Sequence, residues 1–273
     1  MGSRTRISWC AYDGTETDPQ TSKGQTMTMR FKDRTEAGRL LAQKLQNYAN
    51  QPEVLVLALP RGGVPVAVEV ARALGAPIDV FIVRKLGTPG QRELAMGAIA
   101  TGGVRVLNED VIRLMGIREE EIAPVAAEEQ REMERRERTY RGARPAPAVK
   151  DRILILVDDG LATGSTMHAA VAALRQQQPA KIVVAIPVAP LSALQEFASD
   201  ADEVVCVLAP DEPFDGVGRW YLDFSQTTDE EVRELLERAY GAEAPERRPE
   251  IADEKDWAPW RFPSGFPEAQ KGG

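Results

Sequence analysis

Two adjacent carboxylates stand one short loop ahead of a cluster of hydroxyl groups in the middle of this sequence. Ile153–Val157 is an apolar run long enough for one buried strand, and Asp158 and Asp159 follow it directly. A loop of small residues then leads to Thr163–Thr166, at the start of a predicted helix. Such a helix start offers unpaired backbone N–H groups and the positive end of a helix dipole, which suit a phosphate. The carboxylates suit vicinal hydroxyls or a Mg²⁺ ion shared with them, so the segment indicates a site for a sugar phosphate.

An alternative for this segment is an ordinary strand–turn–helix with an acidic N-cap region, which is common in α/β folds. That alternative explains the glycines and the Ser/Thr cluster, but it leaves the two neighbouring carboxylates unexplained. The segment therefore favours ligand binding over a purely structural turn.

The order and spacing of V-D-D-G-L-A-T-G-S-T, over Val157–Thr166, resemble the signature for 5-phosphoribosyl diphosphate (PRPP) in type I phosphoribosyltransferases. The resemblance implies that PRPP binds together with Mg²⁺ as the cofactor. Asp158 and Asp159 would then be catalytic residues that hold the ribose diol and the metal, through ribose hydroxyls or water. The 5′-phosphate would lie in a cradle formed by Ala162, Thr163, Gly164, Ser165 and Thr166.

A second loop that follows a predicted strand carries Arg61, Gly62 and Gly63. Two glycines let a backbone approach an anion closely, and the arginine supplies a planar cationic fork. By resemblance this is the pyrophosphate loop of the family, in which we expect a non-proline cis peptide bond between Arg61 and Gly62. An ordinary glycine turn before a helix is the alternative, and the presence of the PRPP signature disfavours it.

Arg84 and Lys85 are predicted to lie at the end of the next strand, Ile78–Val83, where they suit a diphosphate better than a surface salt bridge. Adenine-type enzymes of the superfamily similarly carry Arg-Lys-x-Gly before a flexible catalytic loop. We therefore assign both residues to the catalytic site as cations that bind diphosphate.

The Gly/Pro-rich stretch Leu86–Ala98 that follows suits a mobile lid, with a hairpin turn at Gly102 and Gly103. Arg92 and Glu93 within it either enter the site when the lid closes or form a solvated charge pair.

The loop after Val204–Leu208 is where the superfamily places its hood, which selects the nitrogenous acceptor. Phe214 is expected to stack on a planar heterocycle, with backbone groups of Pro213–Val217 at its edge and Val217 completing the acceptor site. The alternative, in which Phe214 only packs against its own loop, has nearly equal support from the sequence. Ala162 stands where 6-oxopurine enzymes have an aspartate, which weakens hypoxanthine and guanine as acceptors and leaves the acceptor open.

The composition is that of an acidic protein of 273 residues, with 34 basic and 42 acidic side chains, a formal charge of −8 and a pI near 5.0. This balance argues against nucleic acid and anionic membranes as partners. No apolar run approaches the length of a membrane span, and two cysteines make no disulfide framework. We expect a cytoplasmic protein, and the family resemblance implies a homo-oligomer, a dimer.

The single histidine, His168, lies one turn into a predicted helix, just past the phosphate cradle. A structural role is favoured over a catalytic one. One histidine without a cysteine pair makes no zinc site.

Apolar runs and helical patterns alternate along the chain. Strands are predicted at Val54–Leu59, Ile78–Val83, Ile153–Val157, Ile182–Pro187 and Val204–Leu208, and helices at Val64–Leu74, Ser165–Gln176, Leu191–Ala198 and Asp229–Tyr240. Continuous Val/Ile/Leu runs are what a parallel sheet buried on both faces requires. Right-handed crossovers bring the loops after the strands to one edge of the sheet, where ligands bind.

We therefore predict an α/β fold of the parallel-sheet, Rossmann-like type I phosphoribosyltransferase kind, with a flexible lid hairpin, a charged helical insertion and a small hood. Residues 1–28 are predicted to be a disordered leader, 29–240 the phosphoribosyltransferase domain, and 241–273 an irregular Pro/Glu/Gly-rich tail. The charged stretch Arg118–Arg141 is expected to be a solvated helical flap rather than a binding surface.

The predicted function is that of a phosphoribosyltransferase, a pentosyltransferase that moves the phosphoribosyl group of PRPP to a nitrogenous acceptor and releases diphosphate. A PRPP-sensing regulator with the same fold is the alternative, although the acidic charge and the lack of a recognisable helix-turn-helix disfavour it. A Rossmann dinucleotide enzyme would need G-x-G-x-x-G after the first strand, which Arg61-Gly62-Gly63 does not supply.

Overall fold

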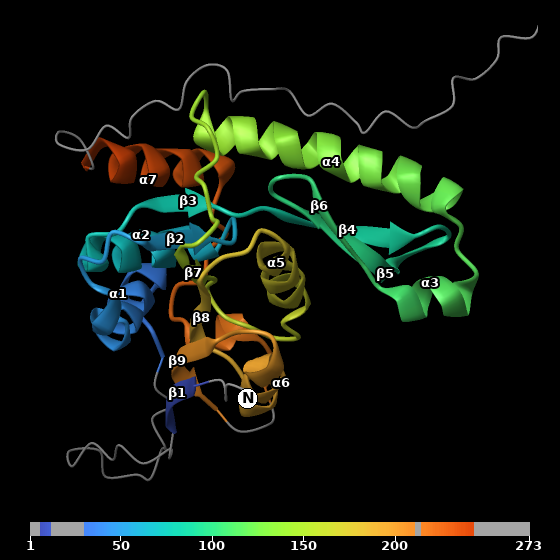
Figure 1. Cartoon of the computed structure of the whole chain (residues 1–273). Helices are drawn as coiled ribbons and strands as arrows, with labels where there is room; N and C mark the ends of the chain where they lie inside the picture. The colour runs from blue at the N-terminus through green and yellow to red at the C-terminus, as the bar shows by residue number, and fades with distance from the viewer. Residues whose placement is uncertain (1–5, 12–29, 211–213, 243–273) are drawn as a thin grey trace, which may run out of the picture. The chain divides into compact units, whose positions relative to one another are not determined.

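The computed structural model describes residues 6–11, 30–210 and 214–242. In that part of the chain a central sheet of parallel strands runs in the order β1-β9-β8-β7-β2-β3 (Figure 1). Its strands are β1 (Arg6–Ala11), β2 (Val54–Ala58), β3 (Ile78–Val80), β7 (Ile153–Val157), β8 (Lys181–Val188) and β9 (Glu203–Ala209). Parallel neighbours need crossover connections, so the loops after β2, β7 and β8 leave the sheet at the same edge.

Successive side chains of the sheet strands pack alternately into two separate hydrophobic cores. Val54 and Val56 of β2 lie in one core, whereas Leu55 and Leu57 lie in the other. The first core also contains residues of α1 (Arg34–Lys44), α2 (Gly63–Leu74) and α7 (Asp229–Ala242), and the second contains residues of α5 (Ser165–Gln176) and α6 (Leu191–Glu196). Burial on both faces explains why these strands lack a polar side. The predicted α/β fold with a parallel sheet is confirmed.

The edge strand β1 differs from the sequence prediction. The sequence predicts a leader outside the fold over residues 1–28, but Arg6–Ala11 pairs in parallel with β9. This pairing occupies backbone hydrogen-bonding groups that the edge of β9 would otherwise leave open, a contribution that hydrophobic patterning does not report. The remainder of the predicted leader lies outside the described residues.

A second, antiparallel sheet replaces the end of one predicted strand. The sequence predicts a single strand over residues 78–83, whereas β3 ends at Val80. A new strand, β4 (Val83–Thr88), then pairs with β5 (Gln91–Ala100), which pairs with β6 (Val104–Leu107). Gly102 and Gly103 both have positive φ in the turn between β5 and β6, where the hairpin turn was predicted. The short helix α3 (Glu109–Met115) follows this sheet.

The long charged helix α4 (Glu119–Arg141) packs against β4 and α7 (Figure 1). Met133 and Tyr140, seven residues apart and hence on one helical face, are buried on its inner side. Arg141 anchors its C-terminal end, since the Arg141 Nε lies 2.9 Å from a carboxylate oxygen of Asp79 and both side chains are 6% exposed. The prediction of a solvated flap is therefore wrong for this inner side, because the helix is packed into the domain.

Short 3₁₀ segments connect several of these elements: η1 (Gln46–Tyr48), η2 (Phe197–Ser199) and η3 (Val217–Trp220). The compact unit ends at Ala242, and the predicted tail beyond it lies outside the described residues. None of the helices in the described ranges has both the length and the apolar character that a bilayer-spanning helix requires.

Candidate functional site

The two glycine-containing loops predicted to bind the sugar phosphate meet at one edge of the sheet. β2 and β7 are paired neighbours, with Ala58 opposite Val157, so the loops after them begin side by side. A Cβ atom at Gly62 would lie 2.0 Å from Oδ2 of Asp159. At Gly63 it would lie 2.7 Å from the carbonyl oxygen of Val157. The close approach of the loops therefore requires glycine at both positions.

The first of these loops contains a non-proline cis peptide bond, one residue earlier than expected. The sequence predicts this bond between Arg61 and Gly62, whereas it joins Pro60 to Arg61. Gly62 already has helical dihedral angles, φ −61° and ψ −33°, because the loop passes directly into α2.

Asp158 and Asp159 occupy unequal surroundings. The backbone N–H of Asp159 donates to Oδ1 of Asp158 at 2.8 Å, whereas Oδ2 of Asp159 accepts from Nε of Arg34 at 2.8 Å. Burial and the adjacent Asp159 carboxylate raise the pKa of Asp158 well above its ordinary value. Burial also raises the pKa of Asp159, and Arg34 opposes this rise. A carboxylate pair that is unfavourable to ionise in the free protein is suited to receive a cation or hydroxyl donors from a ligand.

Arg34 is a residue of this site that the sequence analysis missed. It is the first residue of α1, and its side chain is 11% exposed against 15% for that of Asp159. Its Nη1 donates to the carbonyl oxygen of Ser225 at 2.7 Å, and its guanidinium carbon lies 4.0 Å from the ring centroid of Phe224. A cation in the first turn of a helix is unfavourable, because it lies next to the positive end of the helix dipole. This unfavourable placement is the sequence signal that could have indicated a role for Arg34 outside its helix.

The predicted phosphate cradle forms the turn between β7 and α5. Gly164 is the N-cap residue of α5 with φ +69°, and a Cβ atom there would also lie 2.9 Å from the ring of Phe197. The side chains of Thr163, Ser165 and Thr166 are exposed, and Oγ1 of Thr163 lies 3.2 Å from Oγ of Ser165. Three hydroxyl groups thus stand around the start of a helix, whose first N–H groups have no carbonyl partner within it.

The adjacent cations Arg84 and Lys85 have separate surroundings. They lie within β4 rather than at the end of β3, and successive side chains of a strand point to opposite faces. Arg84 faces α4, where its Nη2 lies 2.6 Å from Oε2 of Glu129. Lys85 lies 3.4 Å from the carboxylate of Glu93, which is fully exposed. The sequence treats Arg84 and Lys85 as one diphosphate-binding pair, and the strand geometry separates them.

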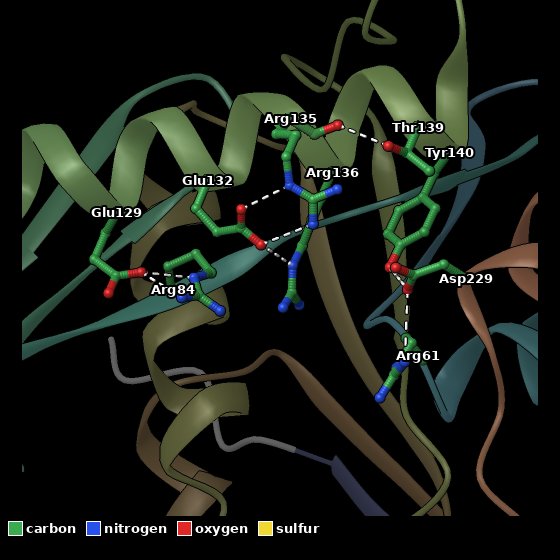
Figure 2. Close-up of polar contacts among 9 residues, drawn as sticks. All are labelled: Arg61, Arg84, Glu129, Glu132, Arg135, Arg136, Thr139, Tyr140 and Asp229. Carbon is green, nitrogen blue, oxygen red and sulfur yellow. Dashed lines mark hydrogen bonds and ion pairs between the residues drawn. The ribbon is translucent and has the colours of Figure 1, made fainter.

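Arg61 extends toward α7. Its Nη1 lies 3.7 Å from Oδ1 of Asp229, the first residue of α7, and the same oxygen accepts a hydrogen bond from the hydroxyl of Tyr140 at 2.6 Å (Figure 2). Burial and this hydrogen bond raise the pKa of Tyr140 to about 12, so the hydroxyl remains a donor even in mildly alkaline solution. The contact links the pyrophosphate loop to α4 and α7.

A groove of about 610 Å³ lies between the antiparallel sheet and α5. Lys85 lines it from β4, and Ser165 and Thr166 line it from the start of α5. His168 also lines the groove, and its Nδ1 lies 2.7 Å from a carboxylate oxygen of Asp200. Lys85 is thereby associated with the phosphate cradle rather than with Arg84.

The hood lies beside the cradle. A cavity of about 220 Å³ is lined by Phe214 together with Ala162, Thr163, Pro190, Ser192, Ala193 and Glu196. Val217, which was predicted to complete the acceptor site, is not among the residues that line this cavity. It packs against the loop that follows Asp158 and Asp159, since a Cβ atom at Gly160 would lie 2.6 Å from its Cγ1. The ring of Phe214 also stacks on that of Trp220, with centroids 6.3 Å apart. Phe214 therefore both packs its own loop and faces a cavity, while Pro213 lies outside the described residues.

The carboxylate pair is the place where a magnesium ion would fit. Within the described ranges no cluster of three or more His, Cys, Asp or Glu side chains is placed to hold a metal by itself. Mg²⁺ commonly binds through one or two carboxylates and completes its shell with water and substrate phosphates. Asp158 and Asp159 match that donor set, and a bound cation would offset the repulsion that raises the pKa of Asp158.

Comparisons with known proteins support one family. A family model for the phosphoribosyl transferase domain matches residues 32–215. Two Mycobacterium tuberculosis proteins, from two strains, are named as candidate phosphoribosyl transferases, and each is 47% identical over 210 residues, which cover 77% of this chain and 47% of the relative. The chain thus spans about half the length of these relatives. The crystal structure of TT1426 from Thermus thermophilus is similar with a TM-score of 0.68 and 44% identity, covering 76% of this chain and 98% of that one.

Proposed function

Because this chain belongs to the phosphoribosyltransferase family, we propose that it binds PRPP with Mg²⁺ and transfers the phosphoribosyl group to a nitrogenous acceptor, with release of diphosphate. The observation that carries this proposal is the contact between the two loops, in which Gly62 lies against Asp159. Carboxylates for a diol, a hydroxyl-rich helix start for a phosphate and a glycine loop for a diphosphate then converge on one edge of the sheet.

In this proposal the chain holds PRPP by its 5′-phosphate and by its ribose hydroxyls. The 5′-phosphate binds at Thr163–Thr166, through helix N–H groups and hydroxyls. Asp158 and Asp159 accept hydrogen bonds from the ribose hydroxyls, which fixes the sugar ring relative to the anchored phosphate. Mg²⁺ held by these carboxylates, directly or through water, would supply Lewis-acid stabilisation of the diphosphate charge.

The bond that breaks joins C1′ of the ribose to a diphosphate oxygen, and its electron pair leaves with the diphosphate. Positive charge builds on the ribose ring in the transition state. Arg61 and Arg84 are cations held by ion pairs, and their charge favours the departing anion without reorganisation of solvent. Lys85, on the other face of β4, lies nearer the phosphate cradle and would favour the 5′-phosphate instead. A nitrogen lone pair of the acceptor forms the new bond to C1′, and a proton on that nitrogen passes to water. This scheme uses no covalent nucleophile from the chain.

The acceptor is proposed to bind in the cavity beside Phe214, next to the cradle. An aromatic face suits a planar heterocycle, and the side chains of Ser192 and Glu196 on the same lining suit its N–H edge. Stacking would hold the acceptor ring while PRPP is held independently at the carboxylates and the cradle.

The experiment that tests this function follows diphosphate release from PRPP by the full chain with Mg²⁺ and a panel of bases and small amines. We expect at least one acceptor to accelerate release well above the slow hydrolysis seen without it. PRPP binding with no acceptor-dependent release would favour the PRPP-sensing alternative, and absence of PRPP binding would contradict both. Light scattering of the same sample tests the dimer that we propose for this cytoplasmic enzyme.

A further inference from the structure

Helix α4 turns a row of polar side chains toward β4 and α7. Glu129, Glu132, Arg136 and Tyr140 follow one another at intervals of three or four residues, so they lie on one face of the helix. At one end of the row, Glu129 accepts a hydrogen bond from Nε of Arg84 at 2.7 Å. At the other end the row reaches the Asp229 carboxylate, so α4 spans the two places where predicted diphosphate-binding arginines are held.

Arg136 lies between those two places. The charges of Arg136 and Arg61 both oppose the burial that raises the pKa of Tyr140, which indicates that both guanidinium groups are near the same hydroxyl. Figure 2 shows the side chains of Arg84, Arg136 and Arg61 on the same side of α4. Their side chains are 27%, 31% and 35% exposed respectively, so each is partly buried and still open to a solute.

Arg136 is not required to neutralise the charge of Glu132, its partner one helical turn away. Glu132 already accepts two hydrogen bonds from Arg135, at 2.7 and 3.0 Å, and one from Nε of Arg136 at 2.9 Å. These arginines lower the pKa of Glu132 to about 2. Among the described residues Arg136 makes its hydrogen bond through Nε alone, to Glu132, so its two terminal nitrogens remain available to an anion.

Each carboxylate along this row is paired with an arginine: Glu129 with Arg84, Glu132 with Arg136 and Asp229 with Arg61 (Figure 2). Tyr140 is neutral at physiological pH, and its raised pKa keeps it neutral in more alkaline solution as well. A planar guanidinium with two available nitrogens matches two oxygens of a phosphate group.

We propose that Arg136 is a third arginine of the diphosphate site, beside Arg61 and Arg84, and that α4 is thereby a wall of that site. This inference rests on the proposed function and extends it to a helix that the sequence interpretation left outside the binding surface. Glu132 positions the Arg136 guanidinium through Nε, and the two terminal nitrogens bind diphosphate oxygens.

The test is calorimetric titration of the full chain with PRPP, inorganic diphosphate and ribose 5-phosphate, all in the presence of Mg²⁺. Arg136→Gln is compared with Arg135→Gln, a control that removes the same charge and the same Glu132 partner one residue away. Arg135 is 54% exposed, against 31% for Arg136. Arg136→Gln should weaken PRPP and diphosphate binding about tenfold or more, the scale of one charge-assisted hydrogen bond, and leave ribose 5-phosphate unchanged.

Arg135→Gln should alter all three affinities by less than about twofold, and Arg136→Lys should recover only part of the loss because lysine lacks the fork. Equal affinities for the two glutamine variants would overturn the role of Arg136 while leaving the proposed function intact. A wild-type protein that binds neither PRPP nor diphosphate would instead overturn the proposed function, and this inference with it. Matching melting temperatures of the two glutamine variants exclude unfolding as the cause of a difference.

Discussion

Replacing Asp158 with asparagine should remove activity without harming the fold. Asparagine keeps an oxygen that can accept the 2.8 Å hydrogen bond from the backbone of Asp159. It also removes a charge that burial and the neighbouring carboxylate make unfavourable, as the raised pKa of Asp158 indicates. The melting temperature should therefore stay level or rise. The kcat/KM for PRPP should fall about 100- to 1000-fold, the scale on which losing one preorganised electrostatic contact acts.

The neighbouring substitution, Asp159→Asn, is the matched comparison because burial raises the pKa of Asp159 too, but this carboxylate is also the hydrogen-bonded partner of a largely buried guanidinium. We expect loss of that partner to outweigh the relief of burying a charge, so stability should fall. The substitution leaves the guanidinium of Arg34, which is 11% exposed, without its charged partner. A hydrogen bond to a charged group contributes about 1.5–3 kcal/mol. Because 1 kcal/mol shifts the melting temperature of a domain of this size by about 2–4 °C, we expect a decrease of about 3–12 °C.

Thermal unfolding by calorimetry and steady-state kinetics of PRPP turnover measure both effects on the same samples. The reasoning fails if Asp158→Asn melts lower than Asp159→Asn, because Asp158 would then have a structural partner that outweighs its electrostatic strain. It also fails if Asp158→Asn retains wild-type kcat/KM, since the carboxylate would then lie outside the reacting site.

Four further outcomes follow from the same geometry. Gly62→Ala should displace the Asp159 side chain and reduce kcat/KM by about 100-fold, as misplacement near reacting atoms does; kinetics measure this. Gly164→Ala should lower stability by about 1–2 kcal/mol because φ is positive there, as denaturant unfolding would report. Phe214→Ala should weaken acceptor binding by about 1–3 kcal/mol in calorimetry and leave PRPP affinity unchanged. Because the pKa of Asp158 is raised in the folded state, the cost of burying this group grows as the pH rises above about 4, where the unfolded carboxyl group titrates, and is complete above the raised pKa. The melting-temperature difference between Asp158→Asn and wild type should therefore shrink as the pH falls toward about 4.

The parallel sheet was predictable because burial on both faces leaves a direct trace in the sequence. β7 and α5 begin and end at the residues that the patterns predict, Ile153–Val157 and Ser165–Gln176. β1 was not predictable in this way, because Arg6–Ala11 is held by backbone pairing at the edge of the sheet. The split of residues 78–83 between β3 and β4 was also hidden, because one apolar run continues through two sheets.

The candidate site was predictable where its residues are close in sequence and less so where tertiary contacts select them. Asp158 and Gly62 belong to local motifs that end neighbouring strands, so topology alone brings their loops together. Arg34 and Arg136 come from helices whose sequences resemble ordinary amphipathic surfaces. Their roles depend on which carboxylate each one meets, at Asp159 and Glu132, and no local pattern encodes that choice.

Whether PRPP binds at the loops after β2 and β7 is tested most directly by equilibrium titration of the full chain with PRPP and Mg²⁺, for the wild type and for Asp158→Asn. We predict saturable binding by the wild type and a loss of at least about tenfold in affinity for the variant, at an unchanged or higher melting temperature. Equal affinities for the two proteins, or no binding by a folded wild type, would contradict the account.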